Sequence, residues 1–148
     1  MGDSAQRRGR SAGSFRVRVL SVFRLASLLA GVALAASAGA APQGDPIAGK
    51  EIYTRCVACH ALAYDRTGPR HCGLFGRRAG SVRDFKYSDA MKRSKIVWNE
   101  RTLDRFLANP LTAVRGTAMG YAGVVDRNER ANLIAYLKQA NQSPECAK

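Results

Sequence analysis

The pentapeptide CVACH, from Cys56 to His60, constrains this chain more than any other stretch. It brings two thiols and an imidazole close together, and each of these side chains is a soft or borderline metal ligand. Three interpretations follow: half of a zinc site, a redox-active dithiol, or an attachment site for c-type haem. Each makes a different demand on the rest of the chain.

The first two interpretations find little support elsewhere in the sequence. A structural zinc site takes four ligands, usually from two spaced clusters. Outside the pentapeptide the only cysteines and histidines are His71, Cys72 and Cys146, and the first two are adjacent. A thioredoxin-like dithiol follows a strand in a βαβ unit. No strand pattern precedes Cys56, so a dithiol of this kind is also disfavoured.

The order C-x-x-C-H is the attachment signature of c-type haem, in which two thiols add to the two vinyl groups. The two intervening residues separate the sulfur atoms by about one vinyl-to-vinyl distance, and the histidine that follows reaches the iron. A flat apolar macrocycle would also give a short chain with long irregular loops something to pack against. We therefore expect one covalent haem c on Cys56 and Cys59, with His60 as an axial ligand of its iron.

The N-terminal residues have the pattern of an export signal. Residues 1–24 hold six arginines and one acid, and the run LASLLAGVALAASAGAA, from Leu25 to Ala41, is uncharged and ends in small residues. This order is typical of a cleaved signal peptide, with a permanent membrane anchor as the alternative. We expect a signal peptide at 1–40, cleaved near 38–41, and a mature domain at 41–148 in the periplasm.

Removing residues 1–40 leaves 18 basic and 10 acidic residues, a net charge of +8. A protein with a net positive charge favours acidic partners. Its basic residues are spread from Lys50 to Lys148, and an exported protein rarely meets nucleic acid. We therefore expect acidic redox proteins as partners rather than nucleic acid, and a monomer that docks transiently on membrane complexes.

Helical patterns occur in three segments of the mature chain, and no strand pattern stands out. Asp45 and Pro46 can begin a helix that runs to the CVACH motif. NERTLDRFLANP predicts a second helix, capped by Asn99. DRNERANLIAYLKQA predicts a third, with Asp126 as its cap and Glu129 three residues further on, as in a capping box. The sequence thus predicts a mostly α-helical domain with two long irregular loops that need something to pack against.

The second axial ligand has to lie across the iron from His60, and the candidates are His71, Met91 and Met119. His71 is eleven residues from His60, a short tether for reaching the other face. Met91 lies in a basic helix-like segment, where a methionine is most simply a packing residue. Met119 lies in RGTAMGYAG, whose glycines let the backbone approach a ring closely, and we favour it. An iron with both His and Met ligands has no open position, which favours one-electron transfer.

With these residues in place, the mature chain resembles the class I cytochromes c, in particular mitochondrial cytochrome c and the short soluble cytochromes c of bacteria. The resemblance runs from about Gly44 to Lys138 and includes GKEIY, TGP, GLFGRRAGSV, YSDAMKRSKIVW, FLANP, GTAMGYAG and LIAYLK. It implies an all-α class I cytochrome c fold, in which the N- and C-terminal helices cross and loops wrap around the haem. It also implies an electron carrier between respiratory, photosynthetic or dehydrogenase complexes, not an enzyme.

The resemblance further implies roles around the haem. The Pro69 carbonyl would hold the His60 ring, Gly49 would let the last helix pass closely, and Tyr121 would lie near the exposed haem edge. Four residues would contact the propionates: Arg77, Tyr87, Trp98 and Thr117. Five basic residues could supply positive charge near the edge: Arg55, Arg70, Lys86, Arg115 and Arg127.

Cys72 and Cys146 remain after haem attachment. Outside the cytoplasm they could form a disulfide that closes a loop of 74 residues, and the fold that the resemblance implies would bring their segments together. Two unrelated thiols are the alternative.

The other functional hypothesis is a c-type haem enzyme or small-ligand sensor. That function would need an open coordination position, so Met119 would have to be displaceable.

Overall fold

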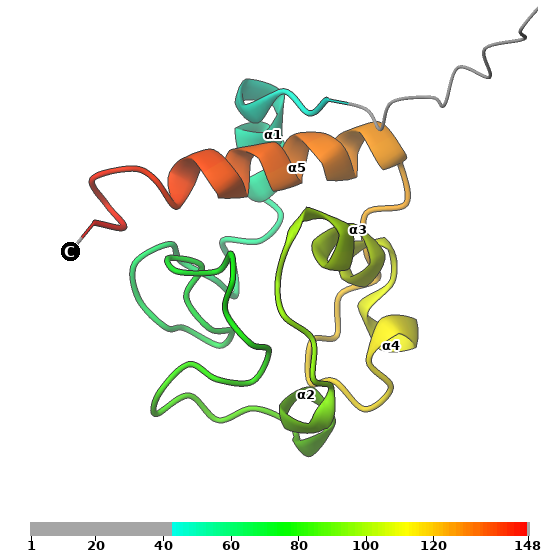
Figure 1. Cartoon of the computed structure of the whole chain (residues 1–148). Coiled ribbons are helices and arrows are strands. Elements are labelled where there is room, and N and C mark those ends of the chain that lie inside the picture. Colours follow the sequence, from blue (N-terminus) through cyan, green and yellow to red (C-terminus); the bar gives the residue numbers. More distant parts are fainter. Residues whose placement is uncertain (1–42, 148) are drawn as a thin grey trace, which may run out of the picture. The chain divides into compact units, whose positions relative to one another are not determined.

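The computed structural model describes residues 43–147, which form five α-helices and no strand (Figure 1). The expected signal peptide and its cleavage site lie outside the described residues. None of the described helices is long and apolar enough to span a membrane. The helices are α1 (Pro46–Tyr53), α2 (Asp89–Arg93), α3 (Glu100–Ala108), α4 (Pro110–Ala113) and α5 (Arg127–Ala140).

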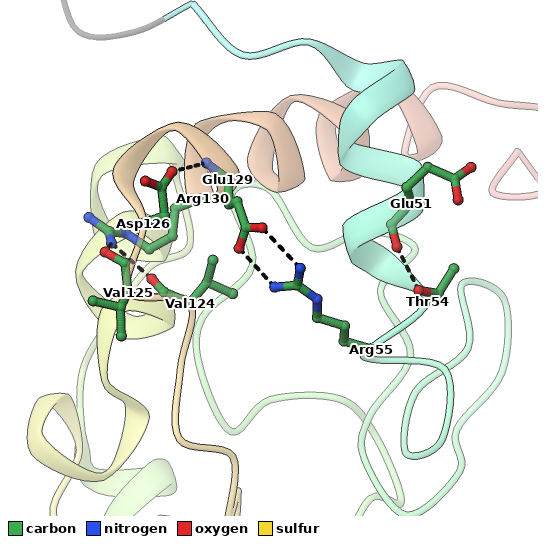
Figure 2. Close-up of polar contacts among 8 residues, drawn as sticks. All are labelled: Glu51, Thr54, Arg55, Val124, Val125, Asp126, Glu129 and Arg130. Atoms are coloured by element: carbon green, nitrogen blue, oxygen red, sulfur yellow. Dashed lines mark hydrogen bonds and ion pairs between the residues drawn. The ribbon is translucent and has the colours of Figure 1, made fainter.

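Helix α1 begins where the sequence predicts and ends earlier. The Asp45 carboxylate accepts a hydrogen bond of 2.8 Å from the Ile47 N–H, and a proline fills the first position. The helix stops at Tyr53 because the Thr54 hydroxyl and N–H both bond back to the Glu51 carbonyl (Figure 2). The prediction that this helix runs to the CVACH motif is therefore wrong, and turns connect the two.

Helix α1 crosses α5, and the crossing depends on a glycine (Figure 1). A Cβ atom on Gly49 would overlap the backbone carbonyl of Asn132 in α5. One turn earlier, the Asp45 N–H donates to the Asn132 side-chain oxygen at 2.8 Å. The expected role of Gly49 agrees with this geometry, since no larger residue fits between the two backbones.

The caps of α3 and α5 differ in detail. Asn99 and Thr102 form a complete capping box at the start of α3. At the start of α5, the Asp126 carboxylate accepts from the Glu129 N–H at 2.8 Å, but the Glu129 side chain does not complete a capping box. It pairs with Arg55, beyond the end of α1, through two hydrogen bonds of 2.8 and 2.9 Å (Figure 2).

Helix α4 occupies a segment in which the sequence predicts irregular structure. Asn109 ends α3 and also caps α4, because its side chain accepts from the Thr112 N–H at 3.0 Å. Pro110 then fills the first position of α4, where its lack of an N–H costs nothing. A short helix thus forms from the residues that terminate the previous one.

The buried arginine of the domain fastens the segment before α5. Arg130 is 6% exposed, and its side chain donates to Asp104 of α3 at 2.8 Å. The same side chain donates to the carbonyls of Val124 and Val125 (Figure 2). Because all these bonds start from one guanidinium, α3, α5 and the chain that precedes α5 are held together.

The segment that follows the CVACH motif is tied to the C-terminal tail. Cys72 and Cys146 are bonded through their sulfur atoms, with their Cα atoms 5.0 Å apart. Nearby, the Leu74 N–H donates to the side chain of Asn141 at 2.9 Å. The tail that follows α5 therefore lies against the loop expected to wrap one side of a haem.

Candidate haem-binding site

One cavity, of about 450 Å³, brings together every haem-site residue that the sequence predicts. This haem cavity is of the size that cofactor sites in proteins have. Its remaining wall is mostly apolar and includes side chains of α2, α3 and α5. The predicted residues that line it are Cys56, Cys59, His60, Pro69, Arg77, Tyr87, Trp98, Thr117, Met119 and Tyr121.

The two thiols of the motif reach the cavity from a single backbone turn. The N–H groups of Cys59 and His60 both bond to the Cys56 carbonyl, at 3.1 and 2.9 Å. The thiols are not bonded to each other, and burial raises the pKa of Cys56 to about 11. No group of three or more histidine, cysteine and acidic side chains suited to a metal ion occurs among residues 43–147. The turn presents two free thiols to the cavity and nothing that would complete a zinc site.

The orientation of the His60 ring is fixed by a hydrogen bond to its Nδ1 atom. Its Nδ1–H donates to the Pro69 carbonyl at 2.7 Å, as the resemblance implies, which leaves Nε2 with a free lone pair. A Cβ atom on Gly68 would overlap the ring, so the backbone presses against the imidazole. Burial lowers the pKa of His60, which favours the neutral form that binds metals. This ring is held as an axial ligand of a haem would be.

His71 lies on the same side of the site as His60. The two rings stack with centroids 4.4 Å apart and planes 16° apart, and His71 Nδ1 shares a hydrogen bond of 3.0 Å with the Tyr53 hydroxyl. Burial lowers the pKa of His71 to about 3. A ring stacked on one ligand cannot reach the opposite face of the same iron, so His71 is not the second ligand. The sequence carried no signal for this stacking.

Both remaining candidates line the cavity. Met91 is buried in α2 at 8% exposure, whereas Met119 is partly buried on the loop that follows α4. That loop needs its glycines: Gly116 and Gly123 have φ angles of +87° and +104°, and a Cβ atom on Gly123 would overlap the Ala108 carbonyl. Glycine therefore lets this loop close over the cavity with Met119 on it.

Comparisons with known proteins agree with this arrangement. The sequence profile of the cytochrome c family matches residues 47–141. The chain belongs to the cytochrome c family.

Its relatives within the cytochromes c are bacterial and eukaryotic. It is 41% identical to cytochrome c2 of Rhodomicrobium vannielii over 112 residues, 74% of this chain and 90% of the relative. It is 48% identical to cytochrome c of Tetrahymena pyriformis over 99 residues, 66% of this chain and 90% of the relative. Among solved structures, cytochrome cH from Methylobacterium extorquens is similar, with a TM-score of 0.63, 36% identity, and coverage of 65% of this chain and 99% of that one.

Membership establishes the coarse features of the protein. It has the all-α class I cytochrome c fold, and it is an electron carrier with covalent haem c. The residues of the cavity fit such a group, since they offer two free thiols, an oriented imidazole, a thioether and an apolar wall.

Two polar side chains that line the cavity, Arg77 and Trp98, are of the kind that haem carboxylates would need. Arg77 donates to the carbonyls of Cys72 and Arg70, both at 2.8 Å, and burial lowers its pKa. Among the described residues the Trp98 indole N–H makes no hydrogen bond, yet it is not sealed from the cavity. Both side chains would therefore be available to donate to the carboxylates of a bound haem.

The five basic residues expected near the haem edge are not equivalent. Arg55 is paired with Glu129, and Arg70 with Asp65 at 3.0 Å. A carboxylate beside each of these two arginines offsets part of the positive charge that they could supply. Lys86, Arg115 and Arg127 form no ion pair with the residues described.

Proposed function

We propose that this cytochrome c is a periplasmic carrier whose haem is attached to Cys56 and Cys59 and ligated by His60 and Met119. When bound, the haem supplies a one-electron ferric–ferrous couple. The observation that carries the proposal is the cavity in which the two thiols, the fixed imidazole and the glycine-flanked methionine meet.

Each proposed ligand has a distinct physical role. Pro69 holds the His60 proton on Nδ1, so Nε2 keeps its lone pair for iron. The Met119 thioether is a soft, weak donor, which favours the ferrous state and raises the potential. With His60 and Met119 both bound to the iron, peroxide and oxygen would find no open coordination position, and the haem would supply electron exchange alone.

The ligand assignment is tested by comparing two methionines that line the same cavity. Met119→Ala should abolish the long-wavelength thioether-to-iron band of the ferric protein and lower the potential by on the order of 0.1–0.3 V. Met91→Leu is the matched control and should leave both unchanged, since leucine preserves the packing volume. If Met91→Leu removes the band and Met119→Ala does not, the assignment is wrong.

The same proposal predicts inertness toward small ligands. A haem enzyme or sensor would need a displaceable Met119, and the reduced protein would then bind carbon monoxide at neutral pH. We expect no carbon monoxide complex with the wild type and rapid formation with Met119→Ala. Binding by the wild type would favour the enzyme or sensor.

Two further proposals come from the sequence: the leader pattern supports export, and the net charge supports acidic partners. We propose that signal cleavage near 38–41 releases a monomer of net charge +8 and that acidic redox proteins dock on it transiently. Raising the ionic strength should then slow its reaction with an anionic partner. N-terminal sequencing of protein from the periplasmic fraction tests the cleavage, and an N-terminus at Met1 would contradict it.

We also propose that Cys72 and Cys146 form a disulfide in the exported protein. Their segments are held together independently by the bond between Leu74 and Asn141. A thiol assay on unreduced, denatured holoprotein should find no free cysteine, and two reactive thiols would contradict the pairing.

A further inference from the structure

A second cavity, of about 420 Å³, is lined by residues of α2, α3 and the end of α4. Three arginines from three separate segments line it: Arg93 at the end of α2, Arg105 in α3, and Arg115 just after α4. No aspartate or glutamate is among its lining residues. We refer to it as the arginine pocket.

The positive charge of this pocket is not neutralised by the residues described. The acids on the flanking helices are already paired elsewhere: Asp89 with Lys92, Glu100 with Lys138, and Asp104 with Arg130. None of the three pocket arginines takes part in an ion pair or a side-chain hydrogen bond with residues 43–147. Three like charges around one cavity repel one another, and a bound anion would relieve that repulsion.

The floor of the pocket is apolar and its hydroxyls are occupied. Phe106 and Val114 are buried at 6% and 4% exposure. The Ser94 hydroxyl donates to the Met91 carbonyl at 2.9 Å, and the Thr102 hydroxyl donates to the Val97 carbonyl at 2.8 Å. Recognition of a polar ligand therefore falls to the guanidinium groups, which bind phosphate and carboxylate through paired hydrogen bonds.

We propose that the arginine pocket binds a compact polyanion, a small molecule with at least two phosphate or carboxylate groups and an apolar part. The volume suits a small molecule rather than a single ion. The charged groups of the ligand would lie between Arg93, Arg105 and Arg115, and its apolar part would lie on the floor. The arginine pocket is separate from the haem cavity, and none of its three arginines lines the haem cavity. The two cavities share one lining residue, Phe106.

That shared residue links the pocket to electron transfer. Phe106 lines both cavities, and Arg115 precedes Met119 by four residues on the same loop. A polyanion in the pocket would place negative charge close to the haem, which favours the ferric iron and lowers the potential. By reciprocity, the ferric protein would bind the anion more tightly by the same factor. This second step rests on the proposed function, whereas the binding step does not.

The binding step is tested on the mature holoprotein at low ionic strength. Citrate, pyrophosphate and phenyl phosphate are titrated by calorimetry and by amide NMR. We expect saturable binding at one site, with shifts confined to the three segments. Citrate and pyrophosphate separate carboxylate from phosphate recognition, and phenyl phosphate tests the apolar floor. If none of the three binds saturably, the proposal fails.

Substitutions then locate the site. Arg93→Gln, Arg105→Gln and Arg115→Gln should each weaken binding about tenfold, the size expected for loss of one charge-assisted contact. Arg101→Gln is the matched control, because Arg101 is an exposed arginine of α3 outside the pocket lining. An equal loss in Arg101→Gln, or no loss in the pocket variants, would mean that the anions respond only to overall charge.

The coupling step has its own readout. The potential is measured with and without saturating citrate, in the wild type and in Arg115→Gln. We expect citrate to lower the potential of the wild type, and Arg115→Gln to need about tenfold more citrate to reach its shift. Binding without a shift would overturn the coupling and leave the site intact. If the Met119 assignment were wrong, the Met119→Ala protein would keep its thioether-to-iron band and these binding curves would be unaffected, so the two failures are distinguishable.

Discussion

The helix-crossing region and the loop region of this cytochrome c are held together by different partners. Where α1, α3 and α5 meet, protein contacts protein: Gly49 passes the Asn132 backbone, and Arg130 joins Asp104 to the chain before α5. The loops at 54–88 and 114–125 instead supply much of the wall of a cavity. Side chains of α3 and α5 also line that cavity, so we expect both regions to gain from the haem and the loop region to depend on it more.

Removal of the haem should cause the largest loss of stability, and the loss should be greater in the loop region than in the helix-crossing region. In Cys56→Ala/Cys59→Ala, the apolar wall would face water, and a large part of the roughly 5–15 kcal/mol typical of a small domain would be lost. Amide exchange should accelerate most in the two loops. Native exchange rates there in the haem-free variant would show that the loop region does not depend on its cofactor.

Removal of the bond between Cys72 and Cys146 should cause the second-largest loss of stability. Cys72→Ser/Cys146→Ser opens a loop of 74 residues, for which the chain-entropy estimate is about 4 kcal/mol. Denaturant unfolding of the ferric protein measures it. The haem spectrum should stay unchanged, because neither residue is a proposed ligand. An unaltered free energy of unfolding would mean that the bond does not constrain the unfolded chain.

A smaller loss is expected within the helix-crossing region. Gly49→Ala forces α1 away from α5, since the new Cβ would overlap the Asn132 carbonyl, and overpacking of this kind costs about 1–3 kcal/mol. The gain in helix propensity offsets part of that. Exposed Lys50→Ala on the same helix is the control and should change stability by less than about 0.5 kcal/mol. Equal effects of the two would show that the crossing is not tight.

The smallest effect concerns the ion pair that bridges the two regions. Arg55 holds the pKa of Glu129 below its usual range through two hydrogen bonds. The stabilisation is thus present at neutral pH and lost as the pH falls through that lowered pKa. Arg55→Gln should be slightly less stable than wild type at pH 7, with no difference in acid or in 1 M salt. A difference that persists in acid would show that Arg55 acts through packing instead.

The helix-crossing region was also the easier one to predict from sequence. The caps Asp45, Asn99 and Asp126 are local signals, because a side chain bonds to a backbone group two or three residues away. The end of α1 was misjudged because the Thr54 hydroxyl competes for a carbonyl that no periodicity reveals. Helix α4 was missed because Asn109 serves two helices at once.

In the site, the sequence predicted the residues that chemistry demands and missed those set by three-dimensional packing. The haem-attachment residues follow from the short motif CVACH, and the Pro69 contact follows from the resemblance of the chain to a family. The stacking of His71 on His60 and the pairing of Arg55 with Glu129, 74 residues away, do not. The arginine pocket likewise joins three residues that no local pattern connects.

The connection of Cys72 to the tail has a consequence for how this protein is made. In the exported protein that we propose, the bond between Cys72 and Cys146 can form only after the 74 residues that follow Cys72 have also crossed the membrane. Until then Cys72 emerges thirteen residues behind Cys59 with two nearby thiols as its only intramolecular partners. Haem attachment to Cys56 and Cys59 therefore competes with disulfide formation between either of them and Cys72. A disulfide that formed first would have to be reduced by a thiol reductase before the haem could attach.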